Sequence, residues 1–171
     1  GIIQAEVLEN GKRVKVLLTE PYGLRDVSLR VLNREIEGSF INTGVPHFVA
    51  VVEDLENFDV VSYGREIRFH EAFAPSGTNV NFIKVNSEDS ISIRTYERGV
   101  ENETLACGTG ATASAIVAYK KGLVKKKPVE VRTKGGDILR IDFDDDLKRV
   151  FLEGSVYKVF EGFLYPEAFE Y

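Results

Sequence analysis

The stretch GTGATASAIVAYKKG, residues 108–122, decides the fold. Alanine, isoleucine and valine are so frequent in it that almost no polar face remains before Lys120. A helix that is apolar on every side must be buried on every side. Gly122 supplies the end of this helix, because glycine adopts the left-handed conformation of a helix C-terminus without steric cost. We therefore expect one buried helix with the rest of the chain wrapped around it.

Alternation of apolar and polar residues predicts β-strands on both sides of this helix. The clearest candidates before it are VKVLL (14–18), VSLRVL (27–32), HFVAVVE (47–53), NVNFIKV (79–85) and SISIRTYE (90–97). Asn10-Gly11 is typical of a hairpin turn. Residues 54–73 predict a turn and then a helix that reaches about His70, and residues 129–164 predict further antiparallel strands.

No linker, low-complexity tract or clear internal repeat interrupts the chain, so residues 1–171 are expected to form a single domain. The expected fold class is α+β: a strongly curved, barrel-like antiparallel β-sheet wrapped around a central buried α-helix. With 171 residues, of which 43% are hydrophobic, the chain is long enough to bury such a core.

Charge and composition argue against several classes of protein. The net charge is -5, whereas a nucleic-acid-binding protein needs a concentrated basic surface to contact phosphates. No stretch approaches the roughly 20 apolar residues of a membrane span, and the first residues lack the apolar core of a signal peptide. A single cysteine excludes an internal disulfide framework. We expect a cytoplasmic protein without nucleic-acid or membrane partners.

Cys107 is the only cysteine, and its neighbours make it a candidate for a reactive thiol. In general a lone cysteine is more often an inert, buried small hydrophobe than a nucleophile. Here Gly108, Thr109 and Gly110 open the buried helix, where unpaired amides and the positive end of the helix dipole favour a thiolate. The same amides can hold a carboxylate or a phosphate. A dinucleotide-binding motif is excluded, because Ala113 stands where its third glycine is required.

Two other clusters carry side chains suited to chemistry. In RTYERG, Glu97 and Arg98 end a strand, and a turn over residues 99–104 would return Glu97 toward Cys107. There a carboxylate can orient the thiol and a guanidinium can bind an anionic substrate group. In NTGVPHFV, His47 follows a tight turn, and histidine is the side chain best suited to share a proton near neutral pH. A solvated strand end and an ordinary surface histidine are the alternatives.

Asparagines and the second histidine complete the polar candidates. Asn79 and Asn81 lie at a strand start in GTNVNF, where an amide can cap a turn or bind a substrate. His70 in RFHEAF has no evident partner, so we expect a structural role. Two histidines and one cysteine without a metal-binding spacing predict no metal site.

Taken in order, three segments resemble the diaminopimelate epimerase family: TGVPHFV (43–49), IRFHEAFAPSGTNVNFIKV (67–85) and RTYERGVENETLACGTGATASA (94–115). The resemblance covers about residues 40–120, and YERGVENETLACGTG (96–110) is its most specific part. It implies an isomerase of lysine and peptidoglycan precursor biosynthesis that converts LL-diaminopimelate to the meso form. The implied mechanism uses two thiols as acid and base, without metal, pyridoxal phosphate or any other cofactor.

The resemblance also implies catalytic roles for three residues of this chain. Cys107 corresponds to one thiol of the acid–base pair, and Glu97 to its polar partner. His47 corresponds to the family histidine that lies beside the other thiol.

Substrate contacts are implied in the same way. Asn79 and Arg98 would contact the substrate, an amino acid, and the amides of Gly108 and Thr109 would hold its α-carboxylate. The family commonly has asparagine where this chain has Val45, which puts recognition of the distal end of the substrate by this segment in question.

The family is built from two similar halves, each with one thiol at the start of a central helix. This chain has one cysteine and no methionine, and its first recognisable element belongs to the second half. We therefore expect the carboxyl-terminal half of an epimerase, which needs the amino-terminal half as its partner and is inactive alone. A homodimer is left open.

Other functions stay open beside this one. A proline racemase-like enzyme would share the fold and the thiol chemistry. Phenazine isomerase-like relatives generally lack the catalytic thiols, so Cys107 argues against them. A non-catalytic binding or assembly domain would keep the fold without an activated thiol.

Overall fold

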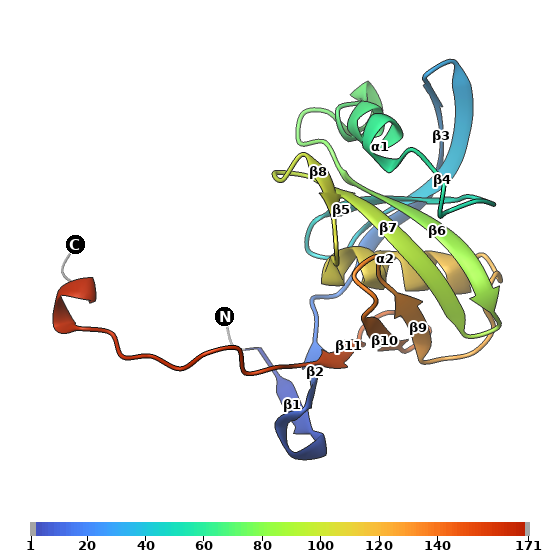
Figure 1. The fold of residues 1–171 in the computed structure, drawn as a ribbon. Coiled ribbons are helices and arrows are strands. Elements are labelled where there is room, and N and C mark those ends of the chain that lie inside the picture. The colour runs from blue at the N-terminus through green and yellow to red at the C-terminus, as the bar shows by residue number, and fades with distance from the viewer. Residues whose placement is uncertain (1–2, 170–171) are drawn as a thin grey trace.

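The structure is a computed structural model that describes residues 3–169. One large β-sheet and two α-helices form its body (Figure 1). The helices are α1 (Val60–Arg68) and α2 (Gly108–Lys120), with short 3-10 helices η1 (Glu9–Gly11), η2 (Glu71–Phe73) and η3 (Pro166–Phe169). The strands are β1 (Ala5–Leu8), β2 (Arg13–Leu17), β3 (Tyr22–Val31), β4 (Arg34–Asn42), β5 (Pro46–Val51), β6 (Asn79–Ser87), β7 (Ser90–Glu97), β8 (Asn102–Thr104), β9 (Val129–Arg132), β10 (Ile138–Phe143) and β11 (Val150–Ser155).

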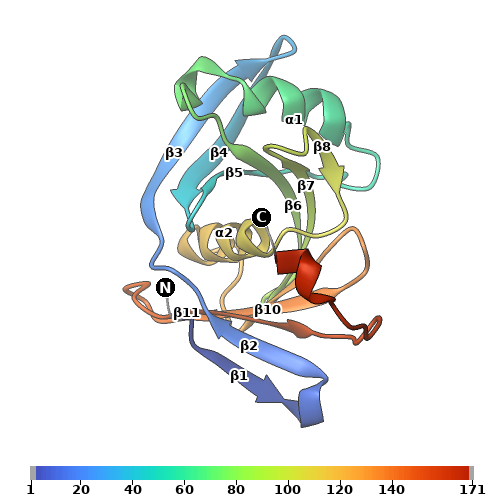
Figure 2. The same ribbon diagram turned by 90° about the vertical axis from the view of Figure 1, so that its left-hand side faces the viewer.

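All of these strands belong to a single sheet. Its order is β1-β2-β11-β10-β9-β7-β6-β5-β4-β3, and β8 pairs with β7 beside this path. The predicted α+β class is confirmed, and the sheet curves around α2 (Figure 2). Among the described strands, however, β1 and β3 lie at two separate ends of the order, so the sheet is open and the expected barrel does not close.

Two strand pairs are parallel, so the expectation of an antiparallel sheet was wrong at these places. β5 pairs in parallel with β6, and β7 pairs in parallel with β9. Parallel neighbours need a long crossover connection, usually a helix. The chain passes through α1 between β5 and β6, and through α2 between β7 and β9. Both predicted helices are therefore crossovers, and hydrophobic alternation alone does not reveal the direction of a strand's neighbour.

Helix α2 is enclosed as its sequence predicts. Every residue from Gly110 to Ala118 is buried, and α2 lies in the concave side of the sheet (Figure 2). The helix ends before Gly122, whose φ of 71° lies in the left-handed region. Small side chains let the sheet approach the helix closely on every side.

The central strands divide their residues between the two helices. Phe48 and Phe82 belong to the apolar cluster around α1, whereas Val49 and Ile83 belong to the cluster around α2. Successive side chains of a strand point to opposite faces. Odd-numbered residues of β5, β6 and β7 therefore face α2, and the middle of the sheet is buried on both sides.

Some element boundaries differ from the sequence predictions. The helix expected to reach about His70 ends at Arg68, and the hairpin turn at Asn10-Gly11 is confirmed by positive φ at both residues. Strand β4 was not predicted. Residues 156–164, expected in strands, lie in no strand, since none of the described strands pairs with them.

Enlarging a residue of α2 tests whether the sheet encloses it tightly. Ala115→Leu should lower the free energy of unfolding by about 1–3 kcal/mol, because a fully buried alanine has no room for three more carbons. Urea unfolding followed by circular dichroism measures the change. Val61→Leu on the exposed face of α1 is the matched control and should have little effect. An Ala115→Leu chain as stable as the parent would contradict tight enclosure.

Candidate active site

Cys107 occupies the N-cap position of α2 in an extended backbone conformation. Its Sγ lies 3.6 Å from Oγ1 of Thr109, and its side chain is half-buried. Ala111 donates the first hydrogen bond of the helix to the carbonyl of Cys107 at 2.8 Å. The amides of Gly108, Thr109 and Gly110 precede that bond and have no acceptor within the helix. The thiol therefore lies where the sequence indicated, at the start of the buried helix.

Burial raises the pKa of the Cys107 thiol above its ordinary value. The hydroxyl of Thr109 and the amides of Gly110 and Thr109 act in the opposite direction, while the charge of Glu97 adds to the rise. The thiolate expected at the helix N-terminus is thus not favoured, because desolvation outweighs the amides. At neutral pH Cys107 is a protonated thiol that can donate a proton.

A hairpin returns the chain from Glu97 to the thiol. Strand β7 ends at Glu97, the chain turns through Gly99 with a φ of 93°, and β8 pairs back so that Asn102 lies opposite Glu97. Helix α2 begins shortly after β8. The turn predicted between residues 99 and 104 forms, and Glu97 lies close enough for its charge to act on Cys107.

Strands β5 and β6 bring His47 together with two asparagines. The parallel register places His47 opposite Asn79. Asn81 Nδ2 lies 3.1 Å from His47 Nδ1 and donates to the carbonyl of Phe48, also at 3.1 Å. The hydroxyl of Thr95 donates to Asn81 Oδ1 at 3.0 Å. These contacts form a buried polar cluster on the face of the sheet that covers α2.

Burial, reinforced by the charge of Arg98, lowers the pKa of His47 to about 3. The ring is therefore neutral at physiological pH. From the sequence we expected His47 to share a proton near neutral pH, and the lowered pKa argues against that role. Its Nε2 is buried and has no hydrogen-bond partner within residues 3–169.

The first turn of α2 packs directly on this cluster. A Cβ atom on Gly110 would lie 2.4 Å from Asn81 Oδ1 and 3.2 Å from Cys107 Sγ, so only glycine fits there. On the other side, the hydroxyl of Thr43 donates to the carbonyl of Thr109 at 3.1 Å. The sheet therefore fixes the position of the turn that carries the thiol.

Asn79 and Arg98 lie at the edge of the cluster. Asn79 Nδ2 donates to the carbonyl of Pro46 at 3.0 Å, and its Oδ1 accepts the backbone amide of Arg98 at 2.9 Å. The guanidinium of Arg98 donates to the carbonyl of Ser76 at 3.1 Å. Arg98 also lines a surface depression of about 370 Å³, but Cys107 is not part of its lining.

Two positions noted in the sequence have clear structural surroundings. Val45 lies in the turn between β4 and β5, where its carbonyl accepts the amide of Thr43 at 3.1 Å, and its side chain offers no hydrogen bond. His70 Nδ1 accepts the amide of Ala72 at 3.2 Å at the start of η2. This contact fits the structural role expected for His70.

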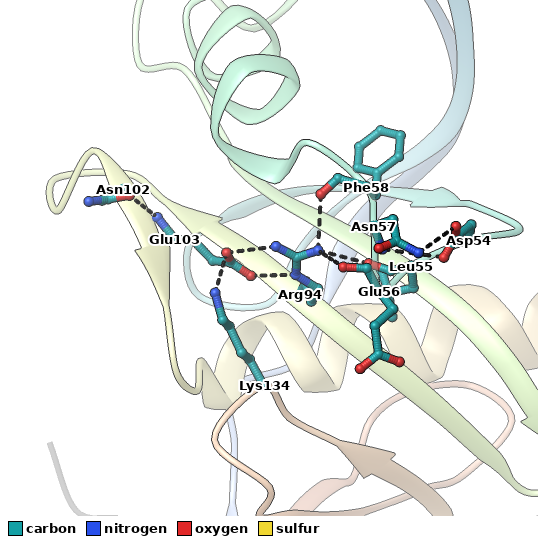
Figure 3. A network of polar contacts seen from close by, with 9 residues as sticks. All are labelled: Asp54, Leu55, Glu56, Asn57, Phe58, Arg94, Asn102, Glu103 and Lys134. Carbon is teal, nitrogen blue, oxygen red and sulfur yellow. Dashed lines mark hydrogen bonds and ion pairs between the residues drawn. The ribbon is translucent and has the colours of Figure 1, made fainter.

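A charged network that the sequence did not indicate supports the segment before Cys107. Arg94 on β7 donates to both carboxylate oxygens of Glu103 on β8, at 2.6 and 2.9 Å (Figure 3). It also donates to three backbone carbonyls in residues 55–58. Lys134, from the turn after β9, binds the same carboxylate. The network ties two segments of the chain, residues 55–58 and the turn that carries Lys134, to the hairpin that leads into the thiol.

Within residues 3–169 no three histidine, cysteine, aspartate or glutamate side chains lie together in a way that could hold a metal ion. None of the helices in this part of the chain has the length and apolar character needed to cross a membrane.

Comparison with known proteins identifies the family. The sequence profile described as "Diaminopimelate epimerase" matches residues 39–159. The chain belongs to the diaminopimelate epimerase family. It is 64% identical over 171 residues to a protein named diaminopimelate epimerase from Aquifex aeolicus (strain VF5), covering 100% of this chain and 61% of that protein. A protein of the same name from Hydrogenobaculum sp. (strain Y04AAS1) is 50% identical over 173 residues, covering 99% and 61%. The chain thus spans about three fifths of these relatives.

Solved structures share the fold at low sequence identity. A probable proline racemase from Agrobacterium radiobacter K84 has a TM-score of 0.72 and 14% identity, covering 99% of this chain and 59% of that one. A hydroxyproline epimerase from Agrobacterium vitis has a TM-score of 0.67 and 16% identity, covering 91% and 54%. At these identities the likeness concerns the fold alone.

Glu103 provides a test of the charged network. Burial alone would raise the pKa of Glu103, but hydrogen bonds from Arg94 and Lys134 lower it below the ordinary 4.5. A lowered carboxyl pKa means that the pairs stabilise the fold above about pH 5 and that this contribution disappears as the pH falls through the lowered pKa. Glu103→Gln should therefore lower the free energy of unfolding at pH 7 by about 1–2 kcal/mol, allowing for solvent screening.

Urea unfolding of the parent and of Glu103→Gln, at about pH 7 and about pH 3, measures this loss and its pH dependence. The difference in the free energy of unfolding between the two chains should be smaller at the lower pH. Glu88→Gln, which removes an exposed partner of Lys126, is the matched control and should change little. A Glu103→Gln chain that unfolds at the parental urea concentration at both pH values would show that the network does not support the hairpin.

Proposed function

We propose that this chain is the carboxyl-terminal half of a diaminopimelate epimerase, which interconverts LL- and meso-diaminopimelate without a cofactor. The observation that carries the proposal is the position of the Cys107 thiol at the N-terminus of α2, where the charge of Glu97 acts on it. The family membership and the 64% identity to the Aquifex aeolicus protein support it.

The proposed reaction uses two thiols on opposite faces of the α-carbon. A thiolate of the amino-terminal half removes the α-proton, so that the Cα–H bond breaks and an S–H bond forms. Cys107 then gives its own thiol proton to the opposite face and becomes a thiolate. The reverse reaction exchanges the two roles. A single base would have to change faces to invert the centre, and two thiols avoid this.

The raised pKa of Cys107 supports its role as proton donor in the resting site. A two-thiol reaction needs one sulfur protonated and one deprotonated before each turnover. Burial and the charge of Glu97 both favour the protonated form of Cys107. After the transfer, the hydroxyl of Thr109 and the amide of Gly110 stabilise the thiolate that remains.

The start of α2 also suits the substrate carboxylate. An amino-acid α-proton is weakly acidic, so the carbanion-like transition state needs hydrogen-bond donors at the carboxylate. We assign this role to the amides of Gly108 and Thr109, which precede the first intrahelical bond and lie at the positive end of the dipole. Because the sheet holds this turn in place, the donors need no rearrangement.

Asn79 and Arg98 are assigned to the rest of the substrate. One Nδ2 hydrogen of Asn79 binds the carbonyl of Pro46, which leaves its second hydrogen as a donor. Arg98 uses one guanidinium nitrogen for the carbonyl of Ser76 and keeps other donors for an anionic group. Val45 offers no side-chain hydrogen bond, so Arg98 is the stronger candidate for the distal end.

The C-terminal segment supports the need for an amino-terminal half. Residues 156–169 extend away from the body of the molecule (Figure 1). Most of their large apolar side chains are exposed, among them Tyr157, Val159, Phe160, Phe163, Leu164 and Tyr165. An exposed apolar surface of this kind marks an interaction site. We propose that the segment packs on the amino-terminal half and that the enzyme works in the reducing cytoplasm, where Cys107 stays a free thiol.

A homodimer is a further part of the proposal. Strand β3 lies at one end of the sheet, and its outer edge has no partner strand among the described residues. An unpaired edge is a natural place for a second copy to add.

An amino-acid racemase of the same fold is the second candidate. The TM-score of 0.72 to a probable proline racemase supports it. Its 14% identity, against 64% for the Aquifex aeolicus protein, makes it the weaker one. Exchange of the α-hydrogen in heavy water separates these two functions. Proline and diaminopimelate are each incubated with the enzyme, and only the true substrate should exchange its α-hydrogen.

Replacement of the thiol tests the proposed activity. With the amino-terminal half present, the parent chain should exchange the α-hydrogen of LL-diaminopimelate in heavy water and form the meso isomer. Cys107→Ala should abolish formation of the meso isomer, because the second face loses its proton donor. His70→Gln, outside the site, is the control and should keep parental turnover. Near-normal turnover by Cys107→Ala, or epimerisation by this chain alone, would refute the proposal.

Truncation tests the role of the C-terminal segment. Removing residues 156–171 should leave the circular dichroism spectrum of the remaining chain nearly unchanged, because the segment forms no strand of the sheet. Binding to the amino-terminal half, measured by analytical ultracentrifugation, should weaken at least about tenfold. The 171-residue chain carrying Phe160→Ser and Phe163→Ser should show the same loss without any change in length. Undiminished binding in both cases would exclude the segment from the interface.

A further inference from the structure

The orientation of the Asn81 amide follows from one contact. Its Nδ2 lies 3.1 Å from the carbonyl of Phe48, and a carbonyl oxygen only accepts hydrogen bonds. The NH₂ group of Asn81, and not its oxygen, must therefore face Phe48. The remaining Oδ1 then accepts the hydroxyl of Thr95 at 3.0 Å. The Thr95 hydroxyl can donate or accept, so its contact is compatible with this orientation, and the carbonyl of Phe48 alone decides it.

This orientation determines the protonation of His47. The second hydrogen of Asn81 Nδ2 faces His47 Nδ1 at 3.1 Å, so Nδ1 accepts and carries no proton. Nδ1 of an imidazolium would place its own hydrogen against that NH₂ group. In the neutral ring the proton must then be on Nε2.

The proton on Nε2 has no acceptor within the described part of the chain, residues 3–169. His47 is fully buried, and Nε2 has no partner among the described residues. A buried donor left unpaired is unfavourable, so a partner from outside is expected. Arg98 and the positive end of α2 lie near the ring and make its surroundings electropositive. An anionic acceptor suits such a place.

We infer that Asn81 is a positioning residue that holds His47 as the neutral tautomer with its proton on Nε2, so that the ring offers a hydrogen-bond donor to an anionic group brought by the substrate or by the amino-terminal half. The second part of this inference rests on the proposed function. The first part concerns the chain alone. In this arrangement His47 is a donor and not a base, because the one nitrogen that can accept is occupied by Asn81.

Nitrogen-15 NMR of the 171-residue chain labelled at histidine tests the tautomer directly. The unprotonated nitrogen of a neutral imidazole resonates far from the protonated one, and the His70→Gln variant assigns the signals because the chain has only two histidines. We expect His47 Nδ1 to have the unprotonated signature and Nε2 the protonated one. The opposite assignment, or a mixture of both tautomers, would overturn the inference.

Substitution of Asn81 tests its role. Asn81→Asp replaces the donor by an acceptor, so the proton should move to Nδ1 of His47. Asn81→Ala introduces no charge, and it should allow a mixture of tautomers if the aspartate variant does not fold. Asn86→Asp makes the same change at an exposed position of β6 and should leave the His47 signals unchanged. Parental His47 signals in a folded Asn81→Ala or Asn81→Asp chain would show that Asn81 does not set the tautomer.

Activity separates this inference from the proposed function. With the amino-terminal half present, Asn81→Asp should slow exchange of the α-hydrogen of diaminopimelate at least about tenfold, as loss of an orienting partner does elsewhere, and Asn86→Asp should not. If Asn81→Asp moves the proton to Nδ1 but leaves the exchange rate unchanged, the inferred use of the Nε2 donor is wrong. If the parent enzyme shows no exchange at all, the proposed function fails. The inferred tautomer of His47 is then tested by the NMR result alone.

Discussion

Burial of α2 on all sides is the constraint on which the rest of the structure depends. A helix of small residues from Gly110 to Ala118 lets the sheet curve closely around it, and close packing leaves it one position and one direction. Its N-terminus therefore emerges at a fixed place against β5, β6 and β7. The thiol of Cys107, the unpaired amides and the positive end of the dipole come together there because the helix cannot shift.

The strands complete the site through their period of two. Along β6, Asn79 and Asn81 share the α2 face with Ile83, and along β7 Thr95 and Glu97 share it with Ile93. The same face is apolar beneath the middle of the helix and polar at its start. Buried polar groups are tolerated only when they are hydrogen-bonded, and the contacts of Asn81 meet this condition. The site is thus the polar end of the apolar core.

Much of this could be predicted from the sequence, and the failures have physical reasons. The apolar helix, its glycine stop and the hairpin from Glu97 to Cys107 follow from local patterns. The parallel pairs do not, because alternation carries no record of a neighbour's direction. The raised pKa of Cys107 was missed because the helix start and burial act in opposite directions, and only the structure shows which is larger. The network of Arg94, Glu103 and Lys134 joins distant residues that each look solvated in sequence.

In the proposed reaction, the electrostatics of the site favour different roles for the two halves of the enzyme. Burial keeps Cys107 protonated and His47 neutral, so this chain presents proton donors around a region made positive by Arg98 and the helix start. Such a site attracts an anion, and neither the protonated Cys107 nor His47, with its lowered pKa, is a strong base. A reaction that removes an α-proton must then take its base from elsewhere, and a thiolate on a second domain would be drawn to the same positive region. Burial would keep the sulfur of Cys107 protonated, and the surroundings of the second sulfur would keep it anionic. The proton donor and the base would then already lie on opposite faces of the α-carbon when the substrate binds.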